Sequence, residues 1–125
     1  MSPGRVLVVD DQPHVTGILR EMLQHFGYEA SSAVSAEEAI AAMLHVRPHV
    51  VFLDLQLPGI SGLEALAYFR EHYPAVPVIV VTGNLEQEMA RQARDHGAFE
   101  VIGKPFSLTV LKNLLARAMK VASPQ

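Results

Sequence analysis

The sequence predicts an α/β protein in which a doubly wound, five-stranded parallel sheet is covered by helices on both faces. Two observations carry this prediction. Short apolar runs alternate five times with segments of helical periodicity, and the connections are too short for anything but right-handed crossovers. Runs that are apolar at nearly every position, and that end at polar residues or glycine, are typical of strands buried on both faces.

The first two strand–helix pairs occupy the beginning of the chain. Residues 5–9 are almost all β-branched or aliphatic, and the following segment has apolar side chains at helical spacing until Gly27, which is placed to end a helix in the left-handed conformation. Residues 28–34 are more polar, which indicates a strand near an edge of the sheet. Ser35 and Glu38 have the spacing of a capping box, so a second helix is expected to begin there.

The middle of the chain contains the two remaining strong strand signals. Residues 50–53 form an apolar run that ends at Asp54, and residues 76–81 form another. Between them, residues 62–72 have the apolar spacing of a helix, which Pro74 prevents from continuing. Both runs are therefore expected to be central strands, joined by a helix.

The last two pairs are weaker in pattern. A poorly apolar helix is expected to begin at Asn84, acting as its cap, and to end at Gly97. Residues 99–102 are the fifth expected strand. Ser107 can cap a fifth helix, whose leucines recur at helical spacing.

Composition excludes several classes of protein. The chain has 125 residues, a formal charge of −3, 50% hydrophobic and 18% charged residues, which predicts one ordered domain. Its mild acidity and scattered Lys and Arg argue against direct nucleic-acid binding, and the lack of cysteine excludes disulfide and thiolate-zinc scaffolds. No apolar run approaches the ~18 residues of a membrane span, and Met1 to Gly4 is no signal peptide. A cytoplasmic location without membrane attachment is expected.

Polar side chains gather where the expected strands end. They are Asp10, Asp11, Asp54, Thr82 and Lys104. Carboxylates held this close together raise one another's pKa or recruit a cation, and a donor set made only of oxygen selects Mg²⁺, with Mn²⁺ as a substitute. A lysine and a hydroxyl opposite such a cation suit a tetrahedral anion. Asp54, after a central strand, could then be a nucleophile that forms an aspartyl-phosphate.

Each of these residues also has an ordinary structural explanation. Asp10 could cap the first helix, Thr82 begins a common turn with Gly83, and Lys104 precedes a proline in a loop. Their joint occurrence, each at the carboxyl end of its own strand, is better explained by one site. Such an edge is where doubly wound sheets bind ligands.

Four short motifs carry a resemblance to a known family. They are Val8-Val9-Asp10-Asp11, Leu53-Asp54-Leu55-Gln56-Leu57-Pro58-Gly59 with Gly62, Val81-Thr82-Gly83 and Lys104-Pro105-Phe106. Together they resemble the response-regulator receiver domain of two-component signalling, from about Arg5 to Met119. The resemblance implies a flavodoxin-like sheet of order 2-1-3-4-5. It also implies a single receiver domain over 1–125, with a core of about 5–119 and a tail or linker start at 120–125.

The resemblance also implies roles for individual residues. Asp54 would accept a phosphoryl group from a partner's phosphohistidine. Asp11 and Asp54 would bind Mg²⁺ directly, Asp10 mostly through water, and the backbone carbonyl of Gln56 would complete the protein ligands. Lys104 would contact the phosphoryl group and precede a cis peptide bond to the following proline.

The resemblance also implies a conformational change on phosphorylation and the kinds of partner protein. The hydroxyl of Thr82 would turn inward once phosphate arrives, while Gln56 and Asn84 could orient the attacking water. The donor would be a sensor histidine kinase or a histidine phosphotransfer protein, selected mainly by residues 12–25. The output would be a downstream effector or a covalently linked domain, with a homodimer through the fourth and fifth helices linked to phosphorylation.

One position departs from the family pattern. Receivers commonly have Tyr or Phe three residues before the lysine, where this chain has Val101. Either another residue fills the space that the aromatic ring would occupy, or the fourth helix and fifth strand move less on phosphorylation than they do in receivers with the aromatic residue. Phe99 would share the strand face of Val101 but does not occupy the switch position.

Two other functions are weighed against a receiver, which is a signalling domain and not an enzyme. A metal-dependent phosphohydrolase of the haloacid dehalogenase type needs an acid where this chain has Gln56. A receiver fold acting without phosphorylation would not need the acids, Thr82 and Lys104. Both alternatives are therefore less well supported by these residues.

Overall fold

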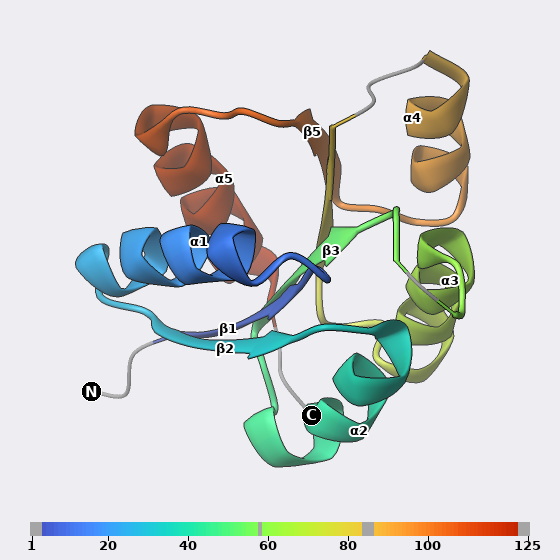
Figure 1. Ribbon diagram of the computed structural model, residues 1–125, viewed down its shortest axis with the longest axis horizontal. Helices are drawn as coiled ribbons and strands as arrows, with labels where there is room; N and C mark the ends of the chain where they lie inside the picture. Colours follow the sequence, from blue (N-terminus) through green and yellow to red (C-terminus); the bar gives the residue numbers. More distant parts are fainter. Residues whose placement is uncertain (1–3, 58, 84–86, 123–125) are drawn as a thin grey trace.

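The computed structural model describes residues 4–57, 59–83 and 87–122, in which strands and helices alternate along the chain (Figure 1). The strands are β1 (Arg5–Val9), β2 (Glu29–Ala33), β3 (Val50–Asp54), β4 (Val78–Thr82) and β5 (Glu100–Gly103). The helices are α1 (Pro13–His25), α2 (Ala36–Val46), α3 (Gly62–His72), α4 (Gln87–Asp95) and α5 (Leu108–Val121).

All strands are parallel and lie in the order β2-β1-β3-β4-β5. The predicted order and the predicted edge position of the second strand are confirmed. The register brings the strand ends together, since Asp54 of β3 lies opposite Val81 of β4, and Thr82 lies opposite Gly103 of β5. The polar residues that end these strands therefore share one edge of the sheet.

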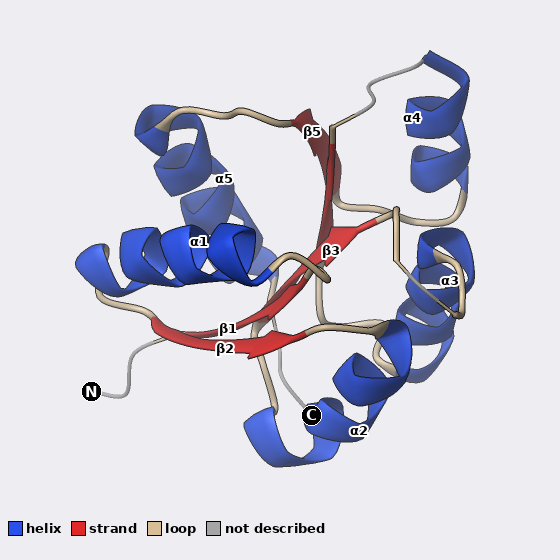
Figure 2. Ribbon diagram, viewed as in Figure 1, coloured by secondary structure: helices blue, strands red, loops and turns tan. Residues whose placement is uncertain are grey.

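Helices cover both faces of the sheet and divide the core into two clusters. Figure 2 shows α1 and α5 on one side and α2, α3 and α4 on the other. Even-numbered residues of β4 such as Val80 pack toward α2, α3 and α4, whereas Ile79 and Val81 pack toward α1 and α5. This alternation follows from the two-residue period of a strand. The side chains of the central strands β3 and β4 are buried on both faces, as their continuous apolar runs predict.

Most helix ends agree with the predicted signals. Gly27 has φ +91° after α1, and the hydroxyl oxygens of Ser35 and Ser107 accept the Glu38 and Val110 amides at 3.1 Å each. The cap predicted at Asn84 lies outside the described residues. Helix α5 continues to Val121, beyond the expected core limit at Met119.

Some local features differ from the sequence predictions. Strand β4 begins at Val78 and not at residue 76, because Pro77 has no amide to donate to a ladder. Ser61 caps α3 by accepting the Glu64 amide at 3.2 Å, a cap that the sequence analysis missed. The expectation for Phe99 is wrong. It precedes β5 and packs on the α1–α5 side under Arg117, whereas Val101 packs on the α4 side.

No helix within residues 4–57, 59–83 and 87–122 has the length and apolar character needed to cross a membrane.

Candidate functional site

Two buried carboxylates and one exposed carboxylate meet at the carboxyl edge of the sheet. Asp10 directly follows β1 and Asp54 ends the neighbouring β3, and they are only 3% and 6% exposed. Asp11 is exposed. One carboxylate oxygen from each of the three lies within 4.8 Å of the others. The acid cluster predicted from the sequence is therefore present.

Backbone amides orient both buried carboxylates. The Gln12 amide donates to Asp10 Oδ1 at 3.0 Å, and the Gln56 amide donates to Asp54 Oδ1 at 2.8 Å. In each case the donor is two residues further along, which is the geometry of an Asx turn. Asp10 is not the cap of α1, because Gln12 holds the N-cap position without a side-chain cap bond. Its second oxygen, like that of Asp54, is left to face a neighbouring side chain.

That neighbour is Lys104. Its Nζ donates to Asp10 Oδ2 at 2.8 Å and to Asp54 Oδ2 at 3.0 Å. The Lys104 amide donates to the Thr82 carbonyl at 2.9 Å, which fixes the loop after β5 against the end of β4. The Lys104–Pro105 peptide bond is cis, as the resemblance implied. One ammonium group thus bridges the two buried acids.

Burial and charge act in opposite directions on these groups. Burial raises the pKa of Asp54, the Gln56 amide and the Lys104 ammonium lower it, and the nearby Asp10 charge raises it again, with a net rise. For Lys104, burial lowers the pKa, but the hydrogen bonds to Asp10 and Asp54 outweigh it and raise the pKa overall. Lys104 is therefore protonated at neutral pH and partly neutralises the acids.

Thr82 lies at the end of β4 with only 1% of its surface exposed. Its Oγ1 lies 3.9 Å from the Sδ of Met89 in the first turn of α4. The sequence pattern alone did not connect Met89 to the site. The sequence did contain a signal for this contact: Thr82 ends a strand, and Met89 lies in the first turn of the next helix, which can reach the end of that strand.

The donor chemistry of the cluster fits a hard divalent cation. The cluster contains three carboxylates, and one ammonium group pairs with two of them, so an excess of negative charge remains. All candidate ligands are oxygens, and the exposed Asp11 leaves one side open to water, as Mg²⁺ prefers. The predicted ligation by the Gln56 carbonyl stays a prediction.

An apolar groove adjoins this site. Helix α1 and the loop between β5 and α5 border about 260 Å³, and the lining residues include Ile18, Met22, Lys104 and Phe106. Ile18 is 58% exposed, although a β-branched apolar side chain on a helix normally packs inward. His14 also lines the groove and is exposed.

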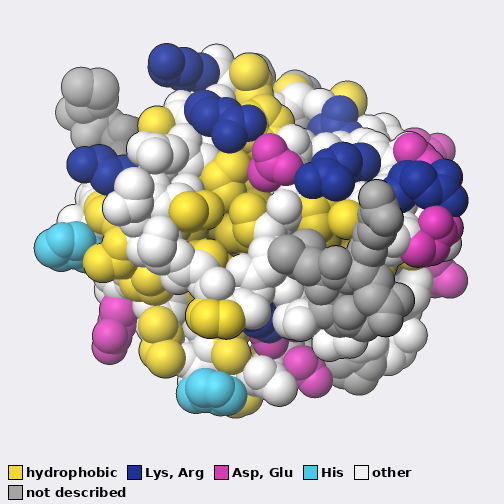
Figure 3. Space-filling view, turned by 90° about the horizontal axis from the view of Figure 1, so that it is seen from above, with side chains coloured by type: hydrophobic (Ala, Val, Ile, Leu, Met, Phe, Trp, Pro, Cys, Tyr) yellow, Lys and Arg dark blue, Asp and Glu magenta, His cyan; other side chains and the backbone are white. Residues whose placement is uncertain are grey.

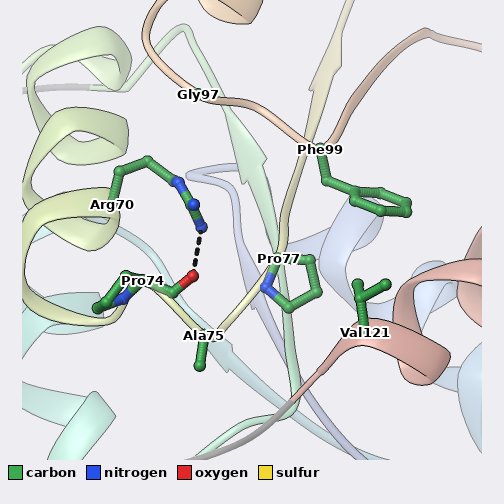
Figure 4. Close-up of a pocket in the computed structure, with 7 residues that line it drawn as sticks. All are labelled: Arg70, Pro74, Ala75, Pro77, Gly97, Phe99 and Val121. Carbon is green, nitrogen blue, oxygen red and sulfur yellow. Dashed lines mark hydrogen bonds between the residues drawn. The ribbon is translucent and has the colours of Figure 1, made fainter.

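A second cavity lies at the opposite edge of the sheet (Figure 4). Pro77 and Phe99, which precede β4 and β5, line it together with Arg70 and the exposed Val121. The Arg70 guanidinium donates to the Pro74 carbonyl at 3.1 Å and so holds its own loop. This cavity lacks the acids and is separate from the site.

Fold and site together define a doubly wound α/β domain with an acid cluster and a bridging lysine at its carboxyl edge. The family model of the response regulator receiver domain matches residues 6–116. The chain belongs to this family. It is thus a receiver domain of the kind found in response regulators.

Relatives and solved structures agree with this assignment. The chain is 36% identical to the nitrogen assimilation regulatory protein NtrX of Azorhizobium caulinodans over 92% of its own length and 26% of the relative. It is 34% identical to the regulatory protein AtoC of Escherichia coli, over 96% of its own length and 26% of the length of AtoC. It therefore spans about a quarter of these curated relatives.

The structural comparison includes two isolated receiver domains. The receiver domain of NtrX from Brucella abortus has a TM-score of 0.88 at 33% identity, over 94% of this chain and 99% of that one. A CheY-like receiver protein from Methanospirillum hungatei has a TM-score of 0.90 at 27% identity, over 95% of both chains. The five-stranded flavodoxin-like order is shared with these neighbours.

Proposed function

We propose that this receiver domain accepts a phosphoryl group on Asp54 from a partner's phosphohistidine, in a Mg²⁺-dependent reaction, and that the modified surface regulates a downstream partner. The observation that carries the proposal is the position of Lys104, whose ammonium lies between Asp10 and Asp54 at 2.8 and 3.0 Å. A cation placed beside a nucleophilic carboxylate is placed to bind the incoming phosphoryl oxygens.

The transfer needs one bond made and one broken. A carboxylate oxygen of Asp54 attacks phosphorus, the phosphorus–nitrogen bond of the phosphohistidine breaks, and its electron pair stays on the imidazole, which takes up a proton. Lys104 exchanges its bond to Asp54 for one to the phosphoryl group, and the Thr82 hydroxyl donates to another phosphoryl oxygen. The Gln56 amide keeps Asp54 oriented, since it holds Oδ1 at 2.8 Å.

Asp10, Asp11 and Asp54 would hold Mg²⁺, with the Gln56 carbonyl as a further ligand. When bound, the ion supplies positive charge next to the transferring oxygens and so lowers the repulsion between two anions. The exposed position of Asp11 supports this assignment, because the site stays open to water and to a donor protein. The domain returns to its resting form when water attacks phosphorus and releases Asp54.

The donor would be a sensor histidine kinase or a histidine phosphotransfer protein. Lys104 lines the apolar groove along α1 and also binds Asp10 and Asp54, so a helix lying in the groove would bring a phosphohistidine close to the acid cluster. Ile18 would be a central contact in this complex, because it is exposed and apolar beside the site. The partner would thus bind through its helix and not through the acids alone.

The output would use another face. Leu108 and Val110 of α5 are exposed, and Figure 3 shows hydrophobic side chains among Lys and Arg on the face seen from above. An effector, a linked output domain or a second receiver would contact this face after phosphorylation. The length of the relatives supports a linked output domain, because the chain spans about a quarter of them. The domain itself would act as a signalling switch and not as an enzyme with turnover, in the cytoplasm.

The test is the intact mass of the protein after incubation with acetyl phosphate and Mg²⁺. Wild type should gain the mass of one phosphoryl group, and Asp54→Ala should gain none. Asp95→Ala is the matched control, since Asp95 is an exposed acid on α4 remote from the cluster. No adduct in wild type despite Mg²⁺ binding would contradict the proposal for this donor, and no Mg²⁺ binding would favour a receiver fold that acts without phosphorylation. Continued turnover of phosphate esters would favour a phosphohydrolase.

A further inference from the structure

Thr82 connects the acid site to α4 through Met89. Strand residues alternate between the two faces of the sheet, so Thr82 lies on the same face as Val80, the face that α4 covers. Its Oγ1 lies 3.9 Å from Met89 Sδ. A thioether is a weak hydrogen-bond acceptor, and a threonine hydroxyl has one hydrogen to donate. The contact thus joins a residue at the site to the first turn of a helix.

The surroundings make the Met89 side chain sensitive to the position of this hydroxyl. Met89 is half-buried and packs against the same cluster as Ala90, Ala93 and Val101. Methionine is long, unbranched and able to adopt several rotamers. Met89 can therefore change its rotamer when Thr82 turns.

We infer that Met89 is a positioning residue for Thr82: it holds the hydroxyl in the resting orientation and transmits its departure to α4. The inference rests on the proposed phosphorylation of Asp54. A phosphoryl oxygen carries negative charge and accepts a hydrogen bond much more strongly than a thioether does. Phosphorylation would turn the hydroxyl away from Met89, and the first turn of α4 would repack. This gives α4 a link to the site that does not need an aromatic side chain at Val101.

The experiment compares Met89→Leu with Met43→Leu. Leucine keeps the apolar volume and removes the sulfur acceptor, and Met43 lies buried on α2 in the same cluster. Met89→Leu should speed adduct formation with acetyl phosphate roughly twofold, the worth of one weak hydrogen bond. Met43→Leu should leave the rate unchanged. Thermal unfolding of both variants reports any difference in folding.

A coupling measurement separates positioning from a structural effect. In a Thr82→Val background there is no hydroxyl to hold, so Met89→Leu should no longer change the rate of adduct formation. An equal rate change in both backgrounds would overturn the inference, because Met89 would then act independently of Thr82.

The methionine methyl groups report the contact directly in ¹³C NMR spectra, with Met89 assigned from its leucine variant. In the resting protein, Thr82→Val should shift the Met89 methyl more than that of Met43. Phosphorylation of the wild-type protein should also shift the Met89 methyl signal more than that of Met43. An adduct on Asp54 without a Met89 shift would overturn the inference and leave the proposed function standing. Absence of any adduct would overturn the proposed function and the switching role, while the resting Thr82→Val spectrum would still test the contact.

Discussion

At the scale of single residues, the site is a balance between two buried acids and one partly buried cation. Asp10 and Asp54 each use one oxygen for a backbone amide and the other for Lys104. An ion pair withdrawn from water loses much of its Coulomb attraction to the cost of desolvation, so the pair as a whole adds little net stability. The arrangement is better suited to exchanging partners than to holding the fold together.

Replacement of Lys104 tests this balance. Lys104→Ala should lower the rate of adduct formation from acetyl phosphate by roughly tenfold or more, because a positioned charge is lost from the phosphoryl site. Mg²⁺ binding should persist or tighten, since the acids lose a competing cation. Intact mass and a Mg²⁺ titration followed by thermal shift measure the two effects. Lys112→Ala, an exposed lysine on α5, is the control, and an unchanged rate in Lys104→Ala would contradict the assigned role.

A pair of hydrogen bonds between Arg5 and His49 lies at the opposite edge of the sheet. The Arg5 amide donates to His49 Nδ1 at 3.0 Å, and the His49 amide donates to the Arg5 carbonyl at 2.7 Å. Burial and the positive charge of Arg5 lower the pKa of His49 below its ordinary value of 6.5. The folded protein therefore prefers the neutral imidazole, whose Nδ1 is free to accept.

This pKa shift predicts a loss of stability in mild acid. The unfolded chain binds a proton at His49 before the folded one does, so the free energy of unfolding falls as pH drops below about 6.5, and the loss is complete below the folded pKa. The effect should stay below about 1 kcal/mol, because His49 is partly hydrated. Urea unfolding of wild type and His49→Asn between pH 8 and pH 5 measures it. The asparagine keeps an acceptor without titrating, and the same pH slope in both proteins would exclude His49 as the cause.

At the scale of elements, the start of α3 fixes the loop that carries the site. The Gly62 amide donates to the Leu55 carbonyl at 3.2 Å, and Leu55 directly follows Asp54. A Cβ at Gly62 would lie 2.3 Å from Leu55 Cα, much closer than carbon atoms can approach. Glycine at this position therefore reflects close packing, since its φ does not require it.

Gly62→Ala should destabilise the protein by about 1–3 kcal/mol, the usual cost of overpacking, although alanine is the better helix former. It should also slow adduct formation, because Leu55 must move and Asp54 with it. The matched control is Gly17→Ala in α1, where a Cβ meets nothing within 4 Å. That change should stabilise by up to about 1 kcal/mol. Chemical denaturation measures the free energy of unfolding of both variants. Equal changes would show that helix propensity, and not close packing at Gly62, determines the effect.

Element boundaries show what local pattern can predict. Strand β1 and helix α3 have the predicted bounds, and the caps at Ser35 and Ser107 are confirmed, because these signals are local in sequence. The ends of β4 and β5 were misplaced by one or two residues. The wrong expectation for Phe99 arose because strand alternation was extended to a residue before the strand.

At the scale of the whole molecule, the site and the groove along α1 belong to one surface. The loop after β5 contributes both Lys104 to the acids and Phe106 to the groove. A phosphoryl donor bound in the groove, as proposed, would therefore lie beside Asp54. We therefore expect that a mutation in the groove can weaken binding of the donor protein without slowing the phosphorylation of Asp54 by a small donor.

Ile18→Glu should slow phosphoryl transfer from a phosphorylated histidine kinase that modifies the wild-type chain, by about tenfold, because a central apolar contact is replaced by a charge. Transfer from acetyl phosphate should be unchanged, since this small donor needs no docking. Leu44→Glu is the matched control, as Leu44 is 74% exposed on α2, away from the groove. Both rates are followed by intact mass. An equal loss with both donors would indicate damage to the site itself.

The sequence by itself determined the order of elements and the five polar residues at the strand ends, because these depend on patterns within a few residues. The order of the strands in the sheet was implied by the resemblance to receiver domains. Only the tertiary structure decided which oxygens face Lys104, that Ile18 borders an open groove, and that Met89 contacts Thr82. Such contacts join side chains that belong to different elements. They depend on rotamers and on the packing of helices over the sheet, which no local pattern encodes.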